Sequence, residues 1–263
     1  MTEQFDYTRT EHVLDPSGPT PAEHAGSDAD VFDERVRAEA GAIIERYPDS
    51  RSALLPMLHL VQSVQGCVTT EGMRFCAEQL ALSTAEVNAV VTFYTMYKRE
   101  PCGKYLVSVC TNTLCAAMGG DETYRALSEE LGVGHEETAG TPGSEGSVTL
   151  EHAECLAACD FAPVMQVNYE YFDHQTAERA LETVRALRRG EPPHPTRGAP
   201  LTDFKDTERQ LAGFFDGPGA REGATASASA PETVRGAELA RQEGWTAPPM
   251  PDEVDLPPVP DTK

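Results

Sequence analysis

The sequence predicts an α+β fold in which a small helical bundle precedes a domain built around a β-sheet. Apolar residues recur at helical spacing from Phe32 to about Tyr97, and from Gly103 onward their period changes to two, as along a strand. With 263 residues the chain is long enough to bury a core. We therefore expect a helical bundle over residues 32–98 and a sheet domain over 99–190.

The helical half carries recognisable helix starts. Leu54, Leu58 and Val61 fall on one face of a helix. Ser83-Thr-Ala-Glu86 has the spacing of a capping box, which places the start of a further helix at about Thr84. Several short helices of this kind, joined by polar turns, are typical of a small bundle.

The second half changes to the period of a strand. Tyr105, Val107 and Val109 alternate with Leu106, Ser108 and Cys110, which indicates a strand ending at the first cysteine. The predicted order is a strand ending at Cys110, a helix over 121–131, strands over 147–152 and 164–169, a hairpin partner at Tyr171 and Phe172, and a helix from a Thr176 cap to Gly190. The first connection is long enough for a crossover between parallel strands. This order is close to that of thioredoxin-like proteins.

Both ends of the chain predict disorder. Residues 1–31 are rich in acids with scattered Pro, Gly and Ser, and cannot bury enough apolar surface to offset chain entropy. Residues 191–263 hold 12 of the 20 prolines and the low-complexity run 224–231. Within this Pro/Ala-rich tail, 204–215 and 237–245 could dock elsewhere, but we expect simple disorder for both.

Composition restricts the function. The chain has 43 acidic and 21 basic side chains, a net charge of −22, which argues against binding to nucleic acid or to an anionic membrane surface. It has no apolar stretch of about 18 residues and no signal peptide, so we expect a cytoplasmic protein without membrane insertion. In a reducing compartment its seven cysteines are metal ligands or buried thiols rather than disulfides.

Four of these cysteines form two pairs. Cys110 and Cys115 are separated by four residues, Cys155 and Cys159 by three, and each pair follows the end of a predicted strand. Both pairs would therefore lie at one end of the sheet. Ligation by four cysteines, two to each iron, is what a [2Fe–2S] cluster requires.

The four cysteines allow other interpretations. A zinc-stabilised interaction module is an alternative, although structural zinc sites more often use C-x2-C pairs. A thioredoxin-type dithiol needs C-x-x-C at a helix start, which is absent, and four unrelated core thiols would not stand in pairs at two strand ends. Cys67 and Cys76 are interpreted as buried hydrophobes, and Cys102 is given no function. The histidines form no ligand spacing, and no Gly-rich phosphate loop follows a strand, so we expect no catalytic residue.

Several segments together resemble one known family. They are Val91-Thr-Phe-Tyr-Thr-Met-Tyr97, Pro101-Cys-Gly-Lys-Tyr105, Val109-Cys-Thr-Asn-Thr-Leu-Cys115 and Glu154-Cys-Leu-Ala-Ala-Cys-Asp-Phe-Ala-Pro-Val164. The chain thereby resembles the E subunit of bacterial NADH:quinone oxidoreductase, the small [2Fe–2S] subunit of the NADH-dehydrogenase module of respiratory complex I. The match extends over roughly residues 32–189.

The resemblance implies a thioredoxin-like ferredoxin domain with one [2Fe–2S] cluster on Cys110, Cys115, Cys155 and Cys159. It also implies a partner, the flavin-binding F subunit, which alone would hold FMN and NADH and against which the helical domain would pack. The chain would then lie at the inner face of the cell membrane as part of a larger complex, with no activity alone. An alternative is the diaphorase small subunit of an NAD-linked hydrogenase or formate dehydrogenase. The family often has Gly where this chain has Ala157 and Asp160.

Overall fold

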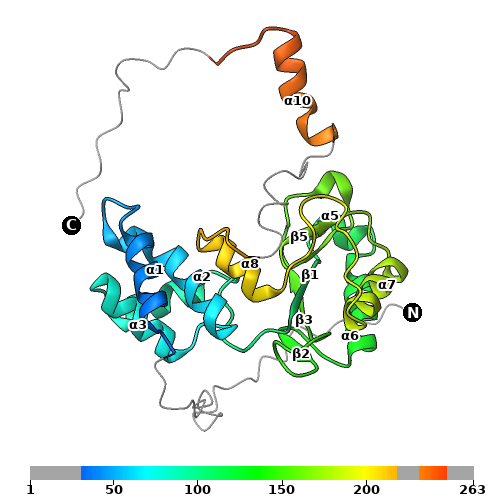
Figure 1. Ribbon diagram of the computed structural model, residues 1–263. Coiled ribbons are helices and arrows are strands. Elements are labelled where there is room, and N and C mark those ends of the chain that lie inside the picture. Colours follow the sequence, from blue (N-terminus) through cyan, green and yellow to red (C-terminus); the bar gives the residue numbers. More distant parts are fainter. Residues whose placement is uncertain (1–30, 218–230, 248–263) are drawn as a thin grey trace, which may run out of the picture.

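The computed structural model describes residues 31–217 and 231–247 (Figure 1). Apart from Val31, the predicted N-terminal leader lies outside these residues, as do parts of the predicted tail. A helical half precedes a five-stranded sheet along the chain, as the change from helical to strand spacing of the apolar residues predicts. Among the described residues, no helix combines the length and the apolar character that crossing a bilayer requires.

The helical half consists of a short 3-10 turn and four helices. These are α1 (Glu34–Ile44), the turn Ser50–Ala53, α2 (Leu54–Gln65), α3 (Thr70–Leu80) and α4 (Thr84–Phe93). The capping box predicted at Ser83 and Glu86 is present at the start of α4. The central helix is α2, where Met57, Leu58 and Val61 are fully buried in a shared apolar core.

The sheet has the strand order β2-β3-β1-β4-β5. Its strands are β1 (Tyr105–Cys110), β2 (Glu137–Ala139), β3 (Val148–Ala153), β4 (Met165–Val167) and β5 (Glu170–Phe172). β1 and β3 are parallel and the other pairs are antiparallel. The sequence did not predict β2, because an edge strand of three residues is too short to show a period of two.

One face of the sheet is apolar and is covered by α6 (Gly120–Leu131) and α7 (Ala177–Arg188), which lie side by side in Figure 1. The alternate residues of β1, beginning at Tyr105, pack here against the buried Leu127 of α6 and Leu187 of α7. α7 begins at the predicted cap, where the Thr176 side chain accepts a hydrogen bond from the backbone of the first turn.

The opposite face of the sheet meets the helical half through buried polar groups. Lys98, only 4 % exposed, forms an ion pair with Glu151 of β3. Ser108 of β1 donates a hydrogen bond of 2.6 Å to the same carboxylate. Burial lowers the pKa of Lys98, but the carboxylates of Glu151 and Glu136 together raise it above its ordinary value. A buried charge of this kind is tolerated because it is paired and hydrogen-bonded.

A helix that the sequence did not predict lies between the two halves. α8 (Phe204–Leu211) falls in the segment for which disorder is expected, but it packs along α2 (Figure 1). Phe204 is buried against Leu106 of β1, and Glu208 is fully buried. The prediction of a disordered tail from residue 191 is therefore wrong for this segment.

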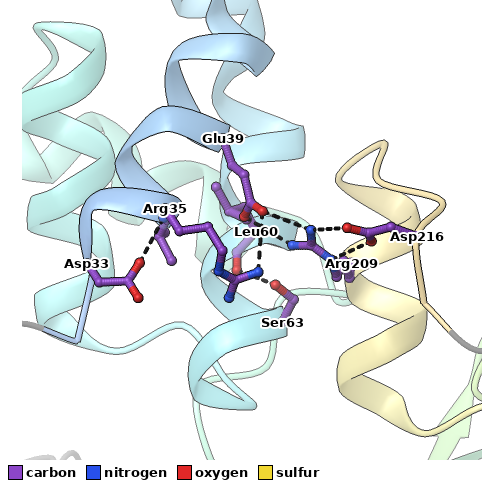
Figure 2. Close-up of polar contacts among 8 residues, drawn as sticks. Asp33, Arg35, Glu39, Leu60, Ser63, Arg209 and Asp216 are labelled. Carbon is purple, nitrogen blue, oxygen red and sulfur yellow. Dashed lines mark hydrogen bonds and ion pairs between the residues drawn. The ribbon is translucent and has the colours of Figure 1, made fainter.

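The polar contacts of α8 explain why its apolar pattern is sparse. Glu208 accepts a hydrogen bond of 2.8 Å from Gln62 Nε2, and its carboxylate lies 2.6 Å from His59 Nδ1. Arg209 forms ion pairs with Glu39 of α1 and with Asp216, which Figure 2 shows. Phe204 and Leu211 are the only apolar residues of this helix, so its apolar pattern is too short to predict it from the sequence. A further helix, α10 (Pro231–Gln242), also lies within the predicted tail.

Candidate metal centre

The sheet topology brings the two cysteine pairs to the same end. Cys110 is the last residue of β1 and stands opposite Ala153, the last residue of the parallel strand β3. Cys115 lies in the short helix α5 (Thr113–Ala117), which follows β1. Cys155 and Cys159 lie in the loop that follows β3. Both pairs lie at the same end of the sheet because the parallel strands β1 and β3 end together.

The first pair is buried. Cys110 and Cys115 are each only 1 % exposed and lie in an apolar cluster that includes Ala158 and Val164. The Cys110 N–H donates a hydrogen bond of 3.1 Å to the carbonyl oxygen of Val164. Both cysteines therefore lie on regular structure, and a backbone hydrogen bond fixes Cys110.

Gly120 allows the chain to pack closely around the first pair. A Cβ added at Gly120 would lie 2.5 Å from the Cys110 carbonyl oxygen and 2.9 Å from the Cys115 carbonyl oxygen. Both distances are too short for any side chain, so only glycine fits there without a backbone shift. The sequence shows small residues after Cys115, and the structure shows which of them the packing requires.

The second pair is exposed and lies outside the strands and α-helices, with Cys159 at the start of a 3-10 turn. The Sγ atoms of Cys155 and Cys159 are 3.5 Å apart. Two thiolates on one tetrahedral metal, with metal–sulfur bonds of about 2.3 Å, lie roughly 3.8 Å apart, so this pair is spaced to share a metal. Between them Ala157 has φ +56°, a left-handed conformation that favours glycine.

Electrostatics at the centre disfavours free thiolates. Burial raises the pKa of the Cys115 thiol to about 11. The hydrogen bond with Cys155, together with charge repulsion from the Cys155 thiolate, raises the pKa of Cys159. Deprotonated cysteines here need a nearby positive charge, which a bound metal supplies.

The thiols also form pairs rather than a cluster of three or more around one point. Within the described ranges, no three His, Cys, Asp or Glu side chains are placed as ligands of a single ion. A [2Fe–2S] cluster takes two cysteines on each of its two irons. The buried pair and the exposed pair, at one end of the sheet, fit that requirement.

The remaining cysteines are buried apart from this centre. Cys67, Cys76 and Cys102 are free and buried. Burial raises the pKa of Cys67 to about 11 and those of Cys76 and Cys102 to about 12. Such thiols stay protonated and behave as small apolar residues.

Sequence reasoning missed the residues that hold the second cysteine loop. Tyr171 of β5 donates a hydrogen bond of 2.7 Å to the Leu156 carbonyl oxygen, and Arg197 lies over the Tyr171 ring. Arg197 belongs to the segment for which disorder is expected, and no local pattern marks its role.

Comparison with known proteins agrees with this geometry. Residues 40–188 match the family model described as thioredoxin-like [2Fe-2S] ferredoxin. The chain belongs to that family. Its cofactor is accordingly a [2Fe–2S] cluster, as the cysteine pairs predict.

Relatives of the chain carry a more specific name. The E subunit of NADH-quinone oxidoreductase from Mycobacterium tuberculosis H37Rv is 54 % identical over 225 residues, covering 82 % of this chain and 83 % of the relative. The second E subunit of NADH-quinone oxidoreductase from Rhizobium meliloti is 36 % identical over 157 residues, covering 59 % of this chain and 91 % of the relative. A solved NAD+-reducing [NiFe]-hydrogenase is similar with 16 % identity and a TM-score of 0.46, over 53 % of this chain and 23 % of that one.

Proposed function

We propose that this ferredoxin is the electron-transfer subunit of an NADH:quinone oxidoreductase. Cys110, Cys115, Cys155 and Cys159 would be the four ligands of its cluster. Electrons from NADH would enter a flavin on a partner subunit, and the cluster would exchange single electrons with that flavin. The observation that carries the proposal is the meeting of two cysteine pairs at one end of a thioredoxin-like sheet.

The surroundings of the cysteines suit this role. A bound [2Fe–2S] cluster supplies one-electron transfer without bond making in a substrate. Cys110 and Cys115 lie in a site from which Ala158, Ala162 and Val164 exclude water. A dry site leaves little solvent to reorganise when the charge changes. The exposed second pair brings the other side of the centre close to the surface.

The helical half offers a surface for the partner. At the end of α4 the Phe93 side chain is 76 % exposed, and Tyr94 beside it is 39 % exposed with its ring 4.9 Å from that of Phe93. Large exposed aromatic residues that adjoin one another mark interaction sites more often than isolated ones do. We assign this surface to the flavin-binding F subunit, which would keep the chain peripheral at the inner face of the membrane.

Co-expression with the F subunit tests the proposal. The complex should contain flavin and pass electrons from NADH to ferricyanide, whereas this chain alone should not oxidise NADH. Phe93→Glu should weaken co-purification at least about tenfold, because a central aromatic anchor is worth about 2 kcal/mol or more.

Trp245→Glu is the matched control, because Trp245 is 64 % exposed but lies outside the helical half. It should co-purify like the wild type. Full co-purification of the Phe93→Glu chain would place the interface elsewhere. A complex that holds flavin and a dithionite-reducible cluster, between which no electrons are exchanged, would contradict the electron-transfer role.

A further inference from the structure

Arg197 lies beside the exposed cysteine loop although it follows the part of the chain that matches the family model. Its guanidinium stands over two aromatic rings, 4.4 Å from the centroid of Tyr171 and 4.9 Å from that of Phe161. It also forms a bidentate ion pair with Asp173, through hydrogen bonds of 2.9 and 2.8 Å. The two side chains are only 13 % and 7 % exposed.

Both aromatic residues hold the loop that carries the second cysteine pair. Tyr171 binds the carbonyl oxygen of Leu156, the residue after Cys155. Phe161 ends the 3-10 turn that begins at Cys159. Because the loop has only this one 3-10 turn and both of its thiols are exposed, side-chain contacts contribute much of what fixes the distance between them.

The backbone around Arg197 is itself fastened to β5. Arg197 forms an isolated antiparallel bridge with Tyr171, and the Thr196 N–H donates a hydrogen bond of 2.9 Å to the Tyr171 carbonyl oxygen. Thr196 Oγ1 donates a further hydrogen bond of 2.9 Å to Asp173 Oδ2. Backbone contacts with β5 thus fix this segment independently of the contacts that the Arg197 side chain makes.

We propose that Arg197 is a positioning residue for the cluster: its planar guanidinium locks Tyr171 and Phe161 and so holds Cys155 and Cys159 at the spacing that one iron requires. This rests on the ligands assigned under the proposed function. Lysine could not replace it, because an ammonium group neither stacks flat on two rings nor binds a carboxylate in a bidentate manner. Outer partners of metal ligands commonly set metal affinity in this way.

The charge of Arg197 has a second effect. While the ion pair with Asp173 is intact, the two charges largely cancel near the cluster. Removing the guanidinium leaves the Asp173 carboxylate uncompensated, and a negative charge beside the centre disfavours an added electron. Arg197→Ala should therefore lower the reduction potential, whereas a residue that only stabilised the fold would leave it unchanged.

The test uses the full-length chain with its cluster assembled. Arg197→Ala and Arg197→Lys are compared with the wild type for the rate of iron release to a chelator, measured anaerobically, and for the reduction potential. We expect both variants to release iron roughly tenfold faster, at the lower end of what loss of an outer partner costs a metal site. Arg197→Ala alone should also shift the potential downward.

Arg185→Ala is the matched control. Arg185 forms a bidentate pair with Glu130, at 2.9 and 2.7 Å, between α7 and α6 and away from the loop. It should release iron at the wild-type rate. If Arg197→Ala does not accumulate as folded protein, Tyr171→Phe is measured in its place. This variant removes only the hydrogen bond to the Leu156 carbonyl oxygen, and it should also release iron faster than the wild type.

Wild-type iron release and potential in Arg197→Ala would overturn the proposal. So would wild-type iron release in Arg197→Lys, because charge alone would then suffice. Cys155→Ala, prepared in parallel, tests the ligand assignment separately. If that chain assembles a normal cluster the proposed ligands fail, whereas a fault confined to the role of Arg197 leaves Cys155→Ala without a cluster.

Discussion

The two cysteine pairs are built in different ways although they would serve one cluster. Cys110 and Cys115 lie on a strand end and a helix, buried, with backbone groups packed closely around them. Cys155 and Cys159 lie on an exposed loop with one 3-10 turn, which is held by side chains from β5 and from the segment after α7. Regular structure fixes the first pair, and tertiary contacts fix the second.

The difference between the two pairs predicts that different kinds of substitution will stop each of them from holding iron. The first pair should be sensitive to any added volume, because the interior there is close-packed and cannot shift cheaply. The second pair should be sensitive to loss of contacts made far along the sequence. Substitutions that act on one pair and leave the other intact can test this division.

The largest effect is expected at Gly120. An alanine Cβ there would stand 2.5 Å from the Cys110 carbonyl oxygen, so the backbone of the first pair has to move. We expect Gly120→Ala to cost about 1–3 kcal/mol of unfolding free energy and to lower the iron content well below that of the wild type. Iron analysis and denaturant unfolding measure the two effects.

Gly41→Ala is the control for this substitution. Gly41 also lies within a helix, but a Cβ added there meets nothing within 4 Å. It should keep its iron and gain stability, by roughly 0.5–1 kcal/mol, from the better helix propensity of alanine. If both variants keep full iron, close packing at Gly120 does not determine the site.

The next effect concerns the segment after α7. Removing residues 190–263 takes away Arg197 and also Phe204 of α8, whose burial alone is worth about 1.5–3 kcal/mol. We expect the thermal midpoint to fall by roughly 3–12 °C and the second cysteine pair to lose iron more readily. Removing only residues 218–263 should change neither. Equal midpoints for the two truncated chains would show that α8 contributes nothing to stability.

The sequence alone suggests a disordered tail from residue 191, whose removal would matter little, and the structure reverses that expectation. Strand and helix periods, caps and cysteine spacing are local, so β1, α4, α7 and the placement of Cys110 could be predicted. The role of α8 could not, because its buried Glu208 and its Arg209 contacts carry charge where a local pattern needs apolar residues. Arg197 was missed for a different reason, because its partners Tyr171, Phe161 and Asp173 are far along the chain and are brought near only by the fold.

The smallest effect is expected at Ala157. Its φ of +56° is unfavourable for a residue with a Cβ. Ala157→Gly should therefore stabilise the loop by about 1 kcal/mol and slow iron release slightly. The comparison variant is Ala158→Gly, whose φ of −124° carries no such strain, so glycine there should only destabilise. Faster iron release in Ala157→Gly would mean that stiffness at this position matters more than strain.

The most direct test is spectroscopy of the chain purified without oxygen. Absorption, iron and zinc content, and EPR before and after dithionite should be recorded for the wild type and for Cys110→Ala, Cys155→Ala and Cys102→Ala. A coloured wild-type chain with about two irons, silent in EPR until it is reduced, is the predicted result. Cys102→Ala should match it, and the other two variants should lose the signal. A colourless chain that holds zinc, or a Cys102→Ala chain that loses iron while Cys110→Ala keeps it, would contradict the assignment.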